Sequence, residues 1–230
     1  MPSWSLDPAR FRPRAHSDGA LLLCIGGILT APADQHGWTD RAERWITRHT
    51  AHDCDSLEYF ATPLLGLGGE KRRVAQVVEL LSGYFAAYQR AGKAPPELHL
   101  VTHSRGAEIA RRLIVECGYK VQSWHAFAPA ISADLQATGI ANALRAGRLD
   151  RLRIYSSRGD AVLRWIAGAA SIFGLYGRLG YSGPAAIPAD LEQRIRVIRR
   201  DDFGHSAWFA PAHFGWSMEE IAADLDPLPF

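Results

Sequence analysis

The sequence predicts an α/β fold: a single doubly wound domain with a mostly parallel sheet of six strands. Short apolar runs alternate with segments of helical periodicity, as in a parallel sheet covered on both faces. With 230 residues, of which 47% are hydrophobic and 22% charged, the chain suits one packed domain. No apolar run reaches the roughly 18 residues that a membrane-spanning helix needs, so no integral membrane segment is expected.

Apolar runs bounded by turn-forming residues supply the strands. The domain is expected to occupy residues 1–230, with residues 1–19 as an N-terminal arm before the first strand. Continuous apolar runs indicate strands that are buried on both faces. In chain order, the predicted strands are Ala20–Ile25, Ser56–Phe60, Glu97–Thr102, Val121–Phe127, Arg151–Ser156 and Arg194–Ile198.

The first apolar run, Ala20–Leu29, has a second interpretation. Three arginines precede it and Ala31–Ala33 follows, an order that imitates a cleavable secretory signal. Asp7 and Asp18 interrupt the basic part, however. The run also contains the pair Gly26-Gly27, which is typical of a turn that follows a buried strand. We therefore expect a strand here.

Helices are expected between the strands wherever apolar residues recur at a spacing of three or four. Val74, Val77, Val78 and Leu81 share one helical face in this way. Glycine-rich breaks are expected at Gly66–Gly69 and Gly174–Pro184. The predicted helices are Thr39–His49, Glu70–Arg90, Ala107–Glu116, Ala133–Ala146, Ala161–Phe173 and Ser217–Leu225.

Charge and cysteine content narrow the classes of function. The chain has 26 basic and 24 acidic residues, and the formal net charge of +2 is too small to favour a nucleic-acid partner. Its three cysteines, Cys24, Cys54 and Cys117, form no Cys-x-x-Cys pair, which disfavours a disulfide framework or a zinc site. A reducing compartment is favoured, so the expected location is cytoplasmic.

The third predicted strand is followed by a sequence suited to a nucleophile. Ser104 lies in the segment Thr102–Gly106, between that strand and the next helix. A serine in such a sharp turn presents its hydroxyl above the edge of the sheet. Ser17 and Ser157 also begin a Ser-x-Gly pattern, but Ser17 precedes a strand and too few loops follow Ser157. Ser104 is therefore the predicted nucleophile.

A serine hydroxyl needs a base to take its proton and an acid to orient that base. Asp160 follows the fifth predicted strand and His205 the sixth, and the carboxyl ends of parallel strands share one edge of the sheet. Asp134, after the fourth strand, is a rival acid, and His213 is a rival base. We prefer Asp160 and His205, the latter because it lies directly beyond the last strand.

Two backbone amides are expected to bind the oxyanion of the transition state. One is the N–H of Arg105, the residue after the nucleophile. The other is expected from the loop after the first strand, where glycines let the backbone approach closely. Ile28, or alternatively Gly27, would supply it.

These segments together resemble a small esterase- or lipase-like serine hydrolase of the α/β-hydrolase superfamily, over roughly Ala20 to Leu225. In that superfamily the order along the chain is also Ser, Asp, His. The matching segments are Leu22–Ile28, His103–Gly106, Asp160 and Gly204–Ser206. Three shorter segments are similar to uncharacterised hydrolases carried by phages and prophages: Gly26–Thr30, Gly37–Ala42 and Phe203–Ser206.

The sequence departs from the superfamily's pattern in three ways. Thr102 takes the place of the glycine that usually begins the nucleophile elbow, and Gly26-Gly27 replaces the usual His-Gly pair. The superfamily's first antiparallel strands are also expected to be missing. A vestigial elbow in a non-catalytic binding module is therefore an alternative. His103 is expected to point away from the nucleophile and to have a structural role.

The resemblance implies hydrolysis of a carboxylic ester through an acyl-enzyme, with no metal or organic cofactor. The expected partner is a small-molecule or lipid-like acyl ester. A thioesterase, an amidase or an acyltransferase would use the same three residues. Residues 161–185 begin with an unusually apolar segment beside Asp160, which is expected to be either a buried helix or a partial lid over an acyl pocket.

Overall fold

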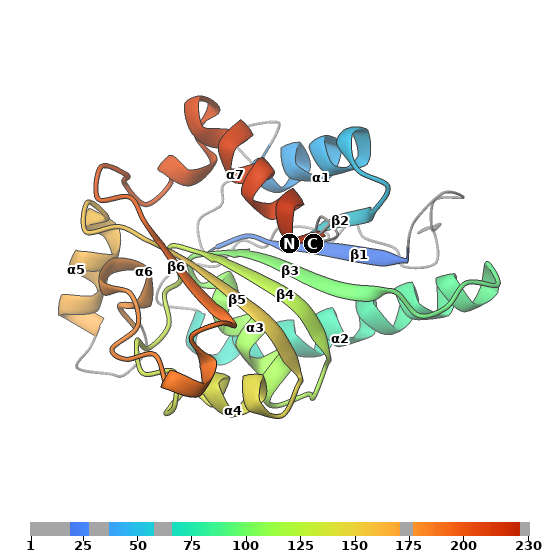
Figure 1. Ribbon diagram of the computed structural model, residues 1–230, viewed down its shortest axis with the longest axis horizontal. Helices are drawn as coiled ribbons and strands as arrows, with labels where there is room; N and C mark the ends of the chain where they lie inside the picture. The colour runs from blue at the N-terminus through green and yellow to red at the C-terminus, as the bar shows by residue number, and fades with distance from the viewer. Residues whose placement is uncertain (1–18, 28–36, 58–65, 171–176, 226–230) are drawn as a thin grey trace.

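The computed structural model describes residues 19–27, 37–57, 66–170 and 177–225 of the chain (Figure 1). Its centre is one six-stranded sheet with the order β2-β1-β3-β4-β5-β6, and every neighbouring pair of strands is parallel. The strands are β1 (Ala20–Ile25), β2 (Asp53–Leu57), β3 (Glu97–His103), β4 (Val121–Phe127), β5 (Leu149–Ser156) and β6 (Ile195–Arg199). The predicted fold class is confirmed.

The chain winds outward in both directions from β1, so helices cover both faces of the sheet (Figure 1). On one face lie α1 (Trp38–His49) and α7 (Pro211–Leu225), and on the other lie α2 (Gly66–Arg90), α3 (Gly106–Val115) and α4 (Ile140–Arg145). The remaining helical elements are α5 (Ala161–Ala170), α6 (Leu179–Ser182), η2 (Ala189–Leu191) and η3 (Ala207–Phe209).

β1 shows why its sequence is a continuous apolar run. Leu21, Leu23 and Ile25 belong to the core beneath α2 and α3, whereas Leu22 and Cys24 belong to the core beneath α1 and α7. None of these five side chains is exposed. Because successive side chains alternate between the two faces, every side chain of a central strand covered on both sides is buried, which favours an apolar residue at each position.

The second strand begins earlier than the sequence predicts. β2 covers Asp53–Leu57 instead of Ser56–Phe60, and residues 58–60 lie outside the described part. The prediction was wrong because two aspartates occupy buried strand positions. Tyr88 donates a hydrogen bond to Asp53, and Tyr84 donates one to Asp55, which satisfies the buried carboxylates.

Two helices also differ from the prediction. Residues 133–139 form turns rather than the start of a helix, because Asp134 accepts the N–H groups of Gln136 and Ala137, and Gly139 takes a φ of 79°. α4 therefore begins only at Ile140. In contrast, α7 begins at Pro211, several residues before the predicted start, since proline is well suited to the first turn of a helix.

One of the two predicted glycine-rich breaks is helical instead. The segment Gly66–Gly69 forms the first turn of α2, so the predicted glycine-rich break there was wrong. Part of the second predicted break, Gly174–Pro184, lies outside the described residues, and the rest contains the short helix α6.

None of the described helices combines the length and the apolar character needed to cross a bilayer.

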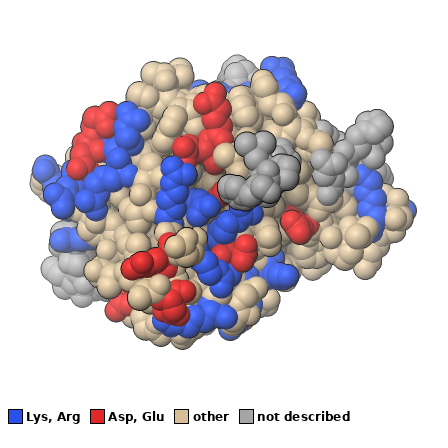
Figure 2. Space-filling view, in the orientation of Figure 1, with Lys and Arg blue, Asp and Glu red and all other residues tan. Residues whose placement is uncertain are grey.

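Charged side chains of both signs are interspersed over the face of the molecule seen in Figure 2. This mixture agrees with the near balance of 26 basic and 24 acidic residues in the chain. It gives that face no large area of a single charge.

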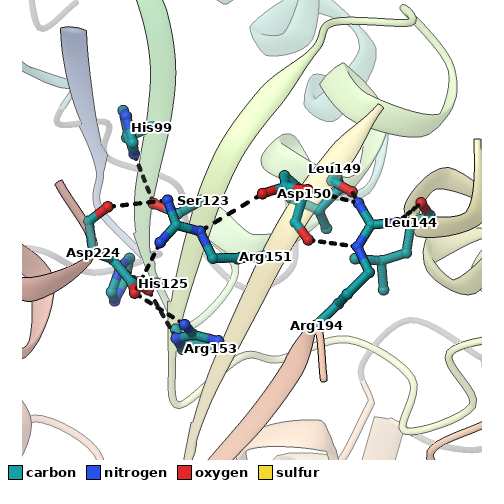
Figure 3. Close-up of polar contacts among 10 residues, drawn as sticks. All are labelled: His99, Ser123, His125, Leu144, Leu149, Asp150, Arg151, Arg153, Arg194 and Asp224. Carbon is teal, nitrogen blue, oxygen red and sulfur yellow. Dashed lines mark hydrogen bonds and ion pairs between the residues drawn. The ribbon is translucent and has the colours of Figure 1, made fainter. Parts of the chain in front are cut away.

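A buried charge cluster attaches α7 to the sheet (Figure 3). Arg153 donates a hydrogen bond of 2.9 Å to the Asp224 carboxylate, and Arg151 donates one of 3.2 Å to the Asp224 carbonyl oxygen. The buried imidazole of His125 lies 3.3 Å from the same carboxylate. Burial by itself would raise the pKa of Asp224, but its contacts with His125 and Arg153 outweigh burial and hold that pKa well below its ordinary value.

A second set of contacts in Figure 3 ties the start of β6 to β5 and α4. Arg194 donates to the carbonyl oxygens of Leu144 and Leu149, and also to the Asp150 carboxylate. A planar guanidinium can satisfy several acceptors at once, so one side chain holds three neighbouring segments together.

Candidate active site

Ser104 occupies a sharp turn between β3 and α3. Its φ of 54° lies in the left-handed region, which residues with a side chain rarely adopt. The Ser104 N–H donates to the carbonyl oxygen of Phe127 over 3.0 Å, and its own carbonyl oxygen accepts from Ala130 over 3.0 Å. These bonds to the end of β4 hold the serine in a conformation that would otherwise be unfavourable.

Glycines let the turn after β1 pack directly against this elbow. A Cβ at Gly106 would lie 2.6 Å from the carbonyl oxygens of both Ile25 and Gly26. A Cβ at Gly27 would lie 2.8 Å from the Cβ atom of Ser104. Neither position can hold a side chain without moving the backbone. Gly27, a predicted oxyanion residue, therefore lies beside the predicted nucleophile, whereas Ile28 lies outside the described residues.

Arg105, the other predicted oxyanion residue, precedes the first residue of α3. Its φ of −70° and ψ of −17° continue into the helix, so its N–H belongs to the helix N-terminus. The helix dipole favours negative charge at this end. The Arg105 side chain donates a hydrogen bond of 3.3 Å to the Ala130 carbonyl oxygen.

Thr102, which replaces the usual glycine of the elbow, is fully buried in β3. Its hydroxyl accepts a hydrogen bond of 2.9 Å from the indole N–H of Trp124 in β4. The threonine thus satisfies a buried indole that a glycine would leave without this partner.

Asp160 and His205 meet at the carboxyl edge of the sheet. His205 Nδ1 lies 2.7 Å from Asp160 Oδ2, and the aspartate is completely buried. Its second carboxylate oxygen accepts the N–H of Leu163 over 2.8 Å, so Asp160 also caps α5. Because both oxygens are occupied, the carboxylate has a fixed orientation toward the imidazole.

The loops that carry these two residues are held together. The Ser157 hydroxyl donates to the Phe203 carbonyl oxygen, and the Arg158 N–H donates to Asp201 over 3.0 Å. A Cβ at Gly159 would lie 2.5 Å from the Asp201 carbonyl oxygen. The close approach of the two loops therefore depends on a glycine immediately before Asp160.

The elbow and the histidine loop also meet directly. His103, adjacent to Ser104, has its Nε2 atom 2.9 Å from the carbonyl oxygen of His205, and their ring centroids are 4.7 Å apart. The hydrogen bonds of these described residues do not include one between Ser104 and His205. In serine hydrolases, such a bond often becomes short only in the complex with substrate.

Asp134 and His213, the alternative acid and base, have contacts that do not involve Asp160 or His205 in the described part of the chain. Asp134 is exposed and its carboxylate closes the turn at residues 134–137. His213 packs against the ring of Phe203, with 4.2 Å between centroids. Of the two predicted acids, Asp160 is the one hydrogen-bonded to His205.

The apolar segment after Asp160 forms α5, which is Ala161–Ala170 rather than Ala161–Phe173, and residues 171–176 lie outside the described part. Leu163 is buried, but Val162 is 43% exposed and Trp165 is 75% exposed. The first turns of α5 are therefore only partly buried. Val162 and Trp165 are thus apolar side chains that face solvent within five residues of Asp160.

Comparisons with known proteins give matches at the level of structure. No protein-family model matches the sequence, and no curated protein matches it. A putative α/β-superfamily hydrolase from Xanthomonas campestris pv. campestris is 14% identical, with a TM-score of 0.52 over 91% of this chain and 99% of that one. Mouse alpha/beta hydrolase domain-containing protein 10 is 13% identical, with a TM-score of 0.55 over 91% and 90%.

The esterase PE8 is similar as well, at 13% identity and a TM-score of 0.54 over 92% of this chain and 95% of that one. At such identities the likeness concerns the fold rather than the reaction. It agrees with the six-stranded parallel sheet and its flanking helices. The protein therefore has the fold of the α/β-hydrolase superfamily.

Proposed function

We propose that the protein is a serine hydrolase that cleaves a carboxylic ester through an acyl-enzyme intermediate. Ser104 would be the nucleophile, His205 the general base and Asp160 the residue that orients the base. The observation that carries this proposal is the 2.7 Å hydrogen bond between the buried Asp160 and His205, on the loop that contacts the Ser104 elbow.

The hydrogen bond to Asp160 defines how His205 acts. A carboxylate can only accept, so His205 carries its proton on Nδ1, and Nε2 is left to take the proton of the Ser104 hydroxyl. The resulting imidazolium is stabilised by the buried carboxylate. The same Nε2 proton is then given to the leaving alcohol.

The oxyanion of the tetrahedral intermediate needs preorganised donors. The Arg105 N–H is one proposed donor, and its place at the N-terminus of α3 supports this role. Ile28, or Gly27, is the other, and the close approach of Gly27 to Ser104 supports a donor from this turn. Water then hydrolyses the acyl-enzyme with His205 as the base. Side chains and backbone amides supply every step, with no cofactor.

We propose a small-molecule or lipid-like acyl ester as the substrate, and residues 161–185 as a partial lid. The exposed apolar side chains of Val162 and Trp165, close in sequence to Asp160, support a surface that meets an acyl chain. A series of p-nitrophenyl esters from acetate to palmitate tests this. Activity that rises with chain length is expected, and activity confined to acetate would contradict the lid.

A fluorophosphonate probe tests the reaction itself. The wild-type protein is expected to be labelled at Ser104, and Ser104→Ala is expected to lose the label completely. If the wild type remains unlabelled, the protein is a binding module rather than an enzyme, and if Ser104→Ala is labelled equally, Ser104 is not the nucleophile. Hydrolysis of matched thioester and amide substrates then distinguishes an esterase from a thioesterase or amidase.

A further inference from the structure

His103 fills the space between the Ser104 elbow and the histidine loop. It is the last residue of β3, and only 8% of it is exposed. Its ring lies edge-on to Trp38 and Phe209, with centroid distances of 6.4 Å and 6.0 Å, and 4.7 Å from the ring of His205. The ring is thus enclosed by aromatic side chains that limit its motion.

The hydrogen bond between His103 and the base has a defined direction. A carbonyl oxygen can only accept, so the 2.9 Å contact requires a proton on His103 Nε2. Burial, followed by the nearby charge of His205, lowers the pKa of His103 to about 3. His103 is therefore neutral near pH 7, and it can stay so when His205 gains a proton.

His205 belongs to a segment without regular secondary structure between β6 and η3. Asp160 orients its ring through Nδ1, but that bond leaves the backbone of the loop to be fixed by other contacts. His103 provides one of these at the His205 carbonyl oxygen itself. Because a peptide bond joins His103 to Ser104, a single side chain connects the backbone of the serine to that of the histidine.

We propose that His103 is a positioning residue, whose Nε2–H holds the backbone of His205 at a fixed place relative to Ser104. The inference rests on the proposed serine-hydrolase function and deepens it. The role needs a hydrogen-bond donor at the far end of the side chain and does not need a positive charge. A misplacement of about 1 Å in a catalytic group can reduce the rate by about 100-fold, so such a bond has a measurable effect.

Two substitutions separate the donor from the packing. His103→Phe keeps an aromatic ring beside Trp38 and Phe209 but cannot donate. His103→Gln places an amide N–H near the position of Nε2. We expect His103→Phe to lower kcat by about 10- to 100-fold with little change in KM, and His103→Gln to keep most of the wild-type kcat.

A spectroscopic measurement reports on the base directly. The proton between His205 Nδ1 and Asp160 should give a low-field NMR resonance in the wild type and in His103→Gln. In His103→Phe the resonance is expected to shift or broaden, because the imidazole is no longer held in one place. A purely structural role for His103 would lower the denaturation midpoint of the variants without producing this difference between Gln and Phe.

The fluorophosphonate reaction separates failure of this inference from failure of the proposed function. An unlabelled wild type overturns the function, and the positioning role with it. A labelled wild type together with His103→Phe labelled at the same rate overturns only the role of His103. If His103→Phe does not fold, His103→Asn replaces it, since the shorter amide cannot reach the His205 carbonyl. Equal kcat values for the Asn and Gln variants would then contradict the inference.

Discussion

Ser104, the proposed nucleophile, has an unfavourable backbone conformation. At a φ of 54° its Cβ is crowded against the backbone, and hydrogen bonds to Phe127 and Ala130 compensate for this strain. A glycine at this position would have no Cβ and would adopt the same φ freely. The serine is therefore retained at some cost in stability.

Comparison of two variants that lack the hydroxyl group measures that cost. Ser104→Ala and Ser104→Gly both remove the hydroxyl, but only the glycine relieves the strain. We expect Ser104→Gly to be more stable than Ser104→Ala by about 0.5–1 kcal/mol, the strain of the left-handed region less the flexibility of glycine. Urea denaturation of both proteins measures this difference, and a glycine variant that is less stable than the alanine variant would argue against a strained elbow.

The two candidate acids can be distinguished residue by residue. Asp160→Asn keeps the acceptor for the Leu163 N–H but no longer fixes the His205 tautomer, and kcat should fall by about 10³-fold or more. Asp134→Asn is the matched control, because an asparagine oxygen can still close the turn at residues 134–137. Its turnover of a p-nitrophenyl ester should stay close to wild type. Loss of turnover in Asp134→Asn alone would reverse the assignment.

Among the elements, the loops after β5 and β6 depend on each other. Neither loop has regular secondary structure around Gly159 or Gly204, and their backbones approach closely at Gly159. Contacts between the loops, such as that from Ser157 to Phe203, hold Asp160 and His205 together. The geometry of the pair is therefore a property of two loops and not of either alone.

Two glycine substitutions test this dependence. In Gly159→Ala the new methyl group would lie 2.5 Å from the Asp201 carbonyl oxygen, so the loops must separate. We expect kcat/KM to fall by about tenfold or more. Gly204→Ala is the control, because a Cβ there meets no atom within 4 Å although the residue precedes His205. Similar kinetics for both variants would exclude a role for the close loop contact.

At the scale of the whole molecule, charge attaches the last helix to the sheet. Asp224 of α7 contacts Arg151 and Arg153 of β5 and His125 of β4, and the contacts with His125 and Arg153 hold its carboxyl pKa below the ordinary value. A carboxyl group whose pKa is lower in the folded state stabilises the protein above its unfolded pKa of about 3.9. That contribution is lost as the pH falls through the folded pKa.

Asp224→Asn should consequently destabilise the protein by about 2–3 kcal/mol at pH 7, because two half-buried arginines lose their counter-ion. The difference from wild type should begin to shrink as the pH falls below about 4, where the carboxyl group of the unfolded protein becomes protonated, and should vanish only below the lowered pKa of the folded carboxyl group. Urea denaturation over a pH series measures both effects. Asp190→Asn, which breaks an exposed pair with Arg145, should change stability little. A constant difference at every pH would refute the charge cluster as the cause.

The sequence predicts the central strands well and the edge strand β2 poorly. β1 and β4 have the predicted bounds, Ala20–Ile25 and Val121–Phe127, because strands covered on both faces are rich in apolar residues, although β4 also buries Ser123 and His125. β2 contains Asp53 and Asp55, whose partners Tyr88 and Tyr84 lie far along the chain on α2. A local pattern carries no information about such distant partners.

The candidate site, like the sheet, has features that the sequence predicts and features that depend on distant contacts. The order of Ser104, Asp160 and His205, each after a predicted parallel strand, was sufficient to bring them to one edge of the sheet. The sequence by itself thus determined the fold class and this edge, since both follow from hydrophobic patterning. Only the tertiary structure decided that Asp160 rather than Asp134 contacts His205, and that the His103 side chain bonds to the carbonyl oxygen of His205. Those contacts depend on loop conformations set by hydrogen bonds between distant segments, which hydrophobic patterning does not encode.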